Sequence, residues 1–308
     1  MLERLWIYQR ERFPLVLHAP VIAAIALSAT SFSMLARQQS GTPGLKQFLV
    51  AFLSSLAFFF QLRVADEWKD FADDARFRPY RPVPRGLISL RELSAIALAA
   101  GSLQLALAFW LDARLLGWLM IVWAYMLLMT KEFFVGEWLR LRPLAYMGSH
   151  MLIVPLIYLY SVACAGAISE WSARLPLVLL LLAGFFSGIV IEVGRKLRAP
   201  EDEELGVATY SATWGVSKSV TAWNIALLLA GVSASVAAGT VGALRVSLAI
   251  LLPAAAVAIT CAVLYQRKPT PRRARLMEAV SGGWALLLYL TLGPLAALWK
   301  IAHQVRHV

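Results

Sequence analysis

Long apolar runs alternate with short polar segments along almost the whole chain. Nine of these runs are long enough to cross a bilayer as a helix, because about 20 apolar residues span the hydrocarbon core. They cover approximately residues 15–36, 45–64, 90–111, 114–131, 146–166, 173–194, 218–240, 243–265 and 278–300. Inside a membrane every backbone polar group needs an internal hydrogen bond, which favours helices. The pattern therefore predicts an all-α polytopic membrane protein.

The composition agrees with this pattern. Hydrophobic residues make up 60% of the 308 positions and charged residues only 15%, which lies outside the range of soluble globular domains. The apolar runs follow one another from end to end without a long polar linker. We therefore predict one transmembrane domain over residues 1–308.

The positive charges predict an orientation. If the N-terminus lies in the cytoplasm, the cytoplasmic segments collect roughly three quarters of the 29 Lys and Arg residues. Nine spans then place the C-terminus on the opposite side. The formal net charge of +11 follows from this topology and from attraction to anionic lipid, so no nucleic-acid partner is expected.

An acidic cluster follows the second apolar run. Five carboxylates stand within nine residues, and on a continuous helix they share an arc of roughly 120°. They are Asp66, Glu67, Asp70, Asp73 and Asp74. Like charges on one helix face repel each other unless a cation neutralises them, and Mg²⁺ prefers such oxygen ligands, usually shared with substrate phosphates. A solvated loop of mixed charge is the alternative, but the helical spacing beside a span favours a metal site.

Basic residues accompany these acids. Arg63 lies one turn before the cluster and Arg78 follows it, as diphosphate chemistry requires. A second charged segment follows the sixth run and contains Glu192, Arg195, Lys196 and Asp202. The two segments are separated by four spans, so both are expected on the same membrane face.

These residues resemble the UbiA superfamily of intramembrane prenyltransferases. The first motif of that family is Asn-Asp-x-x-Asp-x-x-x-Asp, followed by an Arg-Pro loop and Gly-x-Ile-Ser. This chain has Asp66, Glu67, Asp70 and Asp74 at the motif positions, then Arg81-Pro82 and Gly86-Leu87-Ile88-Ser89. The second motif is matched by Asp202, Gly206, Thr209 and Gly215. Its upstream acid is missing, since Arg198 stands there, and either Glu192 or Glu201 replaces it.

The resemblance implies a fold, a reaction and a set of site residues. It implies nine transmembrane helices around a central cavity, and Mg²⁺-dependent transfer of an isoprenyl group from its diphosphate to a lipophilic, aromatic acceptor. The implied metal ligands are Asp66, Glu67, Asp70, Asp74, Glu192 and Asp202, of which Asp70, Asp74 and Asp202 are the catalytic residues. The implied diphosphate-binding residues are Arg63, Arg78, Lys131, Arg195 and Lys196.

Two other functions remain open from sequence. A membrane terpene cyclase would use the same ionisation without an external acceptor, and no residue pattern separates the two. A transporter or lipid-binding scaffold would also use intramembrane carboxylates, although here the acids gather at the membrane face.

Overall fold

The computed structural model describes residues 2–39, 43–166 and 174–304, and these ranges contain helices and no strands. Eight helical stretches are long and apolar enough to cross a membrane. They are α2 (Leu15–Ala36), α3 (Leu45–Lys69), α5 (Leu90–Leu111), α8 (Pro143–Met151) with α9 (Ile153–Cys164), α10 (Arg174–Arg195), α12 (Val216–Thr240), α13 (Leu244–Arg267), and α14 (Pro271–Leu290) with α15 (Ala296–Gln304). The apolar helix α6 (Leu115–Thr130) is shorter than these. The all-α polytopic fold is confirmed, and the expected count of nine is approximate because of α6.

Several helices continue past the apolar run that predicted them. α3 ends at Lys69 rather than at residue 64, and α14 begins at Pro271 rather than at 278. Hydropathy marks the part of a helix that lies in hydrocarbon, whereas backbone hydrogen bonds extend into the charged region beyond it. As a result the first acids of the cluster belong to a membrane helix.

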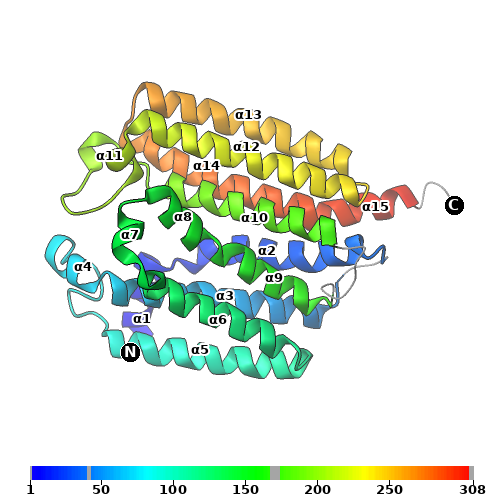
Figure 1. Ribbon diagram of the computed structural model, residues 1–308, viewed down its shortest axis with the longest axis horizontal. Coiled ribbons are helices and arrows are strands. Elements are labelled where there is room, and N and C mark those ends of the chain that lie inside the picture. Colours follow the sequence, from blue (N-terminus) through cyan, green and yellow to red (C-terminus); the bar gives the residue numbers. More distant parts are fainter. Residues whose placement is uncertain (1, 40–42, 167–173, 305–308) are drawn as a thin grey trace.

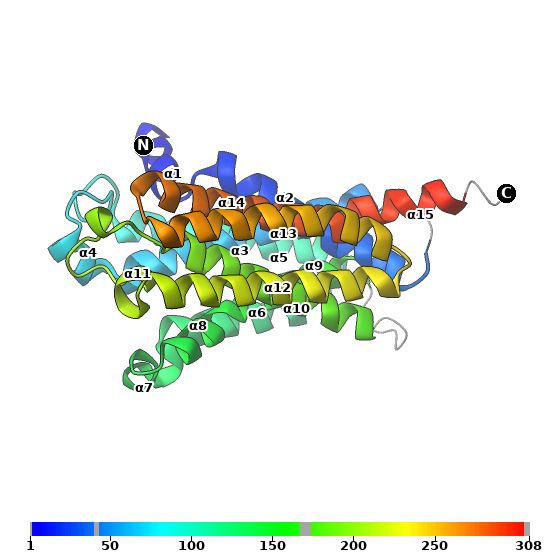
Figure 2. The ribbon, with the colours of Figure 1, turned by 90° about the horizontal axis from the view of Figure 1, so that it is seen from above.

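The short elements gather at one end of the bundle. Figures 1 and 2 both place α4, α7 and α11 together at this end, and α15 at the other. The short elements are α1 (Leu2–Arg12), α4 (Phe71–Phe77), η1 (Glu132–Phe134), α7 (Gly136–Arg140), η4 (Pro200–Asp202) and α11 (Tyr210–Trp214). We call this end of the molecule the mouth. A π-helical segment, η5 (Thr291–Leu295), joins α14 to α15 around Pro294.

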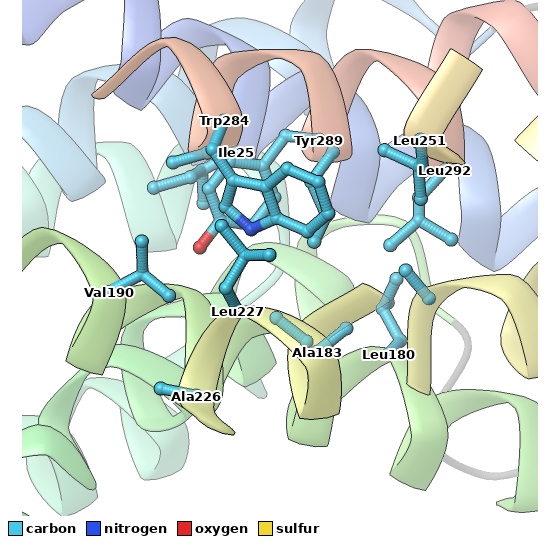
Figure 3. Packing of buried hydrophobic residues seen from close by; sticks show 14 of the residues in the cluster. Ile25, Leu180, Ala183, Val190, Ala226, Leu227, Leu251, Trp284, Tyr289 and Leu292 are labelled. Atoms are coloured by element: carbon cyan, nitrogen blue, oxygen red, sulfur yellow. The ribbon is translucent and has the colours of Figure 1, made fainter. Parts of the chain in front are cut away.

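Two apolar clusters hold the bundle together and share α2 and α9. One joins α3, α5 and α6, and the other joins α10, α12, α13 and α14. Figure 3 shows the second cluster around Trp284, Tyr289 and Leu227. The shared helices α2 and α9 therefore connect the half that carries the first acidic segment to the half that carries the second.

Glycines let α10 approach its neighbours closely. A Cβ on Gly184 would stand 2.8 Å from the ring of Tyr158, and one on Gly188 would stand 3.1 Å from Val154, both on α9. Lipid gives helices little hydrophobic reason to associate, so close packing through small residues supplies much of the attraction. This contact sets the position of α10, whose end carries Glu192 and Arg195.

Candidate active site

The first acidic segment is divided by a break in the helix. α3 ends at Lys69, Asp70 has φ −92° and ψ 1°, and α4 begins at Phe71. Asp66 and Glu67 therefore lie on α3, Asp70 lies at the junction, and Asp74 lies on α4. The carboxylates that would share one face of a continuous helix point to different neighbours.

Two of the predicted ligands are bound by arginines. Glu67 is buried, with 1% of its side chain exposed, and Arg12 of α1 donates from Nε to its Oε1 at 2.5 Å. Asp74 is also buried, and its oxygens lie 2.5 Å from Arg78 Nη2 and 2.7 Å from Arg81 Nη1. A buried carboxylate loses its hydration, and these guanidinium groups compensate for that loss.

Asp66 and Asp70 are the less constrained acids. Asp66 is 46% exposed at its side chain and lies 3.5 Å from Arg63 Nη1. Asp70 is half-buried, and no hydrogen bond or ion pair to its side chain is present among the described residues. Burial, together with the negative charges of Asp66 and Asp74, raises the pKa of Asp70. Lys69 and Arg78 oppose this rise in pKa, but neither forms an ion pair with Asp70 in the described part of the chain.

The second segment contributes cations to the same mouth. Glu192 is mostly buried, and its oxygens lie 2.6 Å from Arg195 Nη2 and 2.7 Å from Lys196 Nζ. Arg195 also interacts electrostatically with Asp66 and with Arg63, which lie on α3. Residues more than 120 positions apart in the chain therefore lie within electrostatic range of one another.

The loops that follow the two segments contact each other. Tyr80 donates its hydroxyl hydrogen to Glu204 at 2.8 Å. Gly206 has a positive φ of 76°, and a Cβ there would stand 2.5 Å from the ring of Phe77. Asp202 is exposed, and its side chain makes no hydrogen bond among the described residues, whereas Glu203 accepts hydrogen bonds from Thr209 and Ser211.

One set of mouth residues is not predicted by the sequence patterns. Lys69 Nζ lies 2.8 Å from Glu132 Oε1 and 2.7 Å from the Tyr146 hydroxyl, and the Tyr146 ring stacks on His150. Glu132, Phe133 and Phe134 all have positive φ, from 48° to 60°, which is unusual for residues other than glycine. No signal in the local sequence indicates this left-handed turn. The neighbouring Lys131, a predicted diphosphate ligand, is exposed.

The acidic side chains of the mouth suit a metal ion that is shared with substrate phosphates better than one held by protein ligands alone. Among the described residues no group of three or more His, Cys, Asp or Glu side chains is gathered in position to hold a metal. Mg²⁺ is usually held by one or two carboxylates and completed by water and substrate phosphates. Asp66 and Asp70 suit that arrangement, and Arg63 and Arg195 lie within electrostatic reach of Asp66.

The fold and the mouth residues together define a polytopic helical protein with acids and guanidinium groups gathered at one end of the bundle. A family model, that of the UbiA prenyltransferase family, matches residues 25–282. The chain therefore belongs to the UbiA prenyltransferase family, and it is an intramembrane prenyltransferase. A comparison with curated proteins finds no match.

Solved structures show the same fold at low sequence identity. A digeranylgeranylglyceryl phosphate synthase in membranes is similar with 17% identity and a TM-score of 0.60, covering 94% of this chain and 97% of its own. The apo structure of a UbiA homolog from Aeropyrum pernix K1 is similar with 16% identity and a TM-score of 0.65, covering 88% of this chain and 96% of its own.

Proposed function

We propose that the protein transfers an isoprenyl group from its diphosphate to a lipophilic acceptor, with Mg²⁺ bound at the mouth. The observation that carries the proposal is that Arg195, of the second segment, lies within electrostatic reach of Asp66 and Arg63 on α3, with Asp70 beside Asp66. The name of one structural neighbour, a digeranylgeranylglyceryl phosphate synthase, supports isoprenoid chemistry.

The basic and the acidic residues of the mouth would have different roles in the reaction. Cleavage of the allylic carbon–oxygen bond leaves its electron pair on the diphosphate, and fixed cations stabilise that charge. Arg63, Arg195 and Lys196 would bind the diphosphate oxygens, and Asp66 and Asp70 would hold the metal. A bound Mg²⁺ supplies further stabilisation of the leaving group as a Lewis acid. The apolar helices below exclude water from the allylic cation.

The remaining predicted residues divide into two groups. Glu67, Asp74 and Glu192 each have arginine or lysine partners, so each needs a change of partner before it can bind metal. Arg78 is the partner of Asp74, so it too needs a change of partner before it can bind the diphosphate. Asp202 and Lys131 are exposed, and a bound substrate would have to draw them inward. Their assignment as ligands stays a prediction.

An assay with purified protein tests the proposal. The protein is incubated with Mg²⁺, isoprenyl diphosphates of increasing chain length and a lipid extract, and both released diphosphate and prenylated products are measured. We expect release to require the divalent cation and to cease with excess chelator, because the unneutralised acids repel the substrate. Undiminished turnover in chelator would contradict the metal-dependent mechanism.

The same assay separates transfer from cyclisation. A transferase forms its product only when the lipid extract is present, whereas a cyclase forms a hydrocarbon or alcohol from the diphosphate alone. We expect the first outcome. A cyclic product formed without the extract would show that the protein is a cyclase and not a transferase.

A further inference from the structure

The turn between α13 and α14 contains a groove that the active site does not use. That turn lies at the mouth end of the bundle, beside the outer helix α13 (Figure 1), and the groove is lined by residues on both sides of it. Its volume is about 520 Å³. The lining residues are Leu264, Thr270, Arg272, Arg273, Arg275 and Leu276.

The groove is strongly basic. Five cations stand within nine residues of chain, namely Arg267, Lys268, Arg272, Arg273 and Arg275. No ion pair joins any of them to an acid in the part of the chain that the structure describes. The nearest carboxylate along the chain is that of Glu278, three residues after Arg275 on α14, and it forms no ion pair with these cations in the described part of the chain.

The arginines differ in how they are held. Arg273 donates from Nη1 to the carbonyl oxygens of Leu264 and Lys268, at 2.7 and 3.1 Å, so it closes the turn. Arg272 and Arg275 are exposed and stand three residues apart on α14, on neighbouring positions of one helix face. Two guanidinium groups are thus presented together beside a turn that a third one fixes.

Apolar residues continue the groove away from the charged rim. Leu264 is 41% exposed and lies about one turn before the end of α13, and Leu276 is 42% exposed and lies one turn after Arg272 on α14. Going from the helix ends into the spans, a ligand would meet guanidinium groups first and leucines next. A phospholipid has this order of groups at the membrane interface, with a phosphate above an acyl chain.

We propose that this groove binds one anionic phospholipid, with its phosphate on Arg272 and Arg275 and the start of an acyl chain against Leu264 and Leu276. Clustered Lys and Arg next to a span attract anionic headgroups, and the leucine pair adds a contact that a free phosphate cannot make. The inference is independent of the proposed function, because no residue of the groove belongs to the mouth site.

Native mass spectrometry of the whole purified protein tests this site. The protein is released from vesicles of equal phosphatidylglycerol and phosphatidylcholine, and retained lipid is counted for wild type and for the Arg272→Ala/Arg275→Ala variant. We expect wild type to retain phosphatidylglycerol preferentially, and the variant to lose that retention by about tenfold or more, since each cation near an anionic surface contributes several-fold in affinity. Unchanged retention in the variant would overturn the proposal.

Matched variants distinguish lipid binding at the groove from attraction to the total positive charge at this end of the bundle. Arg10→Ala/Arg91→Ala removes two exposed arginines at the same end of the bundle, on α1 and α5. We expect this variant to retain lipid like wild type, and an equal loss would show that only total charge matters. Leu276→Asn should weaken lipid retention while leaving binding of inorganic phosphate unchanged. If inorganic phosphate displaces the lipid at equal concentration, the leucines contribute nothing and the site is not a lipid site.

Discussion

Asp70 and Asp73 are three residues apart, but their surroundings differ. Asp73 is exposed, whereas Asp70 is half-buried, and its side chain forms no hydrogen bond or ion pair within the described residues. The pKa of Asp70 is raised, because burial and the charges of Asp66 and Asp74 disfavour its ionised form. We expect Asp70→Asn to lower metal-dependent diphosphate release at least about 100-fold, equivalent to roughly 2.7 kcal/mol of transition-state stabilisation. Asp73→Asn is the matched control and should retain most activity.

The same substitution has an expected effect on stability. A carboxyl with a raised pKa in the folded protein stabilises it fully only at acid pH, and that contribution is lost as pH rises through the folded pKa. Metal-free Asp70→Asn should therefore melt at or above the temperature of wild type at pH 7, with the difference shrinking on acidification. A large drop in melting temperature at pH 7 would show that Asp70 has a structural partner instead.

Asp74 has a different expected phenotype. Its buried carboxylate lies between Arg78 and Arg81, and removing one partner of a buried ion pair typically costs about 3–5 kcal/mol. We expect Asp74→Asn to lose thermal stability as well as activity, measured by a melting curve in detergent beside Asp73→Asn. An Asp74→Asn protein that melts like wild type but is inactive would identify Asp74 as a metal ligand rather than an anchor for the Arg-Pro loop.

At the scale of elements, the ion pair of Arg12 with Glu67 attaches α1 to α3. Tyr8 of α1 is buried beside it, and its pKa is raised by burial and then by the charge of Glu67. We expect Glu67→Gln to increase hydrogen exchange in α1, because Arg12 loses a charged acceptor. Glu3→Gln, on the exposed side of α1, is the control. If Glu67→Gln instead abolishes activity with α1 exchange unchanged, Glu67 acts as a metal ligand.

The turn between α6 and α7 shows a limit of sequence reasoning about elements. Lys131 follows an apolar run and is a reasonable candidate for a substrate ligand from its position alone. The left-handed backbone at residues 132–134 instead directs Glu132 toward Lys69, while Lys131 is exposed. Positive φ at three successive residues other than glycine is unfavourable locally, so contacts with Lys69 of α3, Tyr125 of α6 and His150 of α8 stabilise it.

At the scale of the whole molecule, the mouth depends on the packing of two halves. α2 and α9 belong to both apolar clusters, and the glycines of α10 allow its close approach to α9. This packing brings Arg195 within electrostatic reach of Asp66 and Arg63. The relative position of Arg195, Asp66 and Arg63 is therefore set by the packing of the two halves and not by either half alone.

The sequence by itself determined the class of protein. Apolar runs long enough to span a bilayer must be helical, since lipid offers no partners to the backbone, and this predicted the all-α polytopic fold. The spacing of Asp66, Asp70 and Asp74, with Arg81-Pro82 after them, indicated the family that the comparison confirmed. Both signals are local in the chain, so they can be read without coordinates.

Only the tertiary structure decided the partner of each charged group. The helical arc drawn from residue 66 to residue 74 assumes an unbroken helix, but the break at Asp70 separates the acids. Glu67 pairs with Arg12 across 55 positions of chain, and Asp66 meets Arg195 across a still longer separation. Charges interact through space according to distance and burial, and neither quantity is encoded in spacing along the sequence.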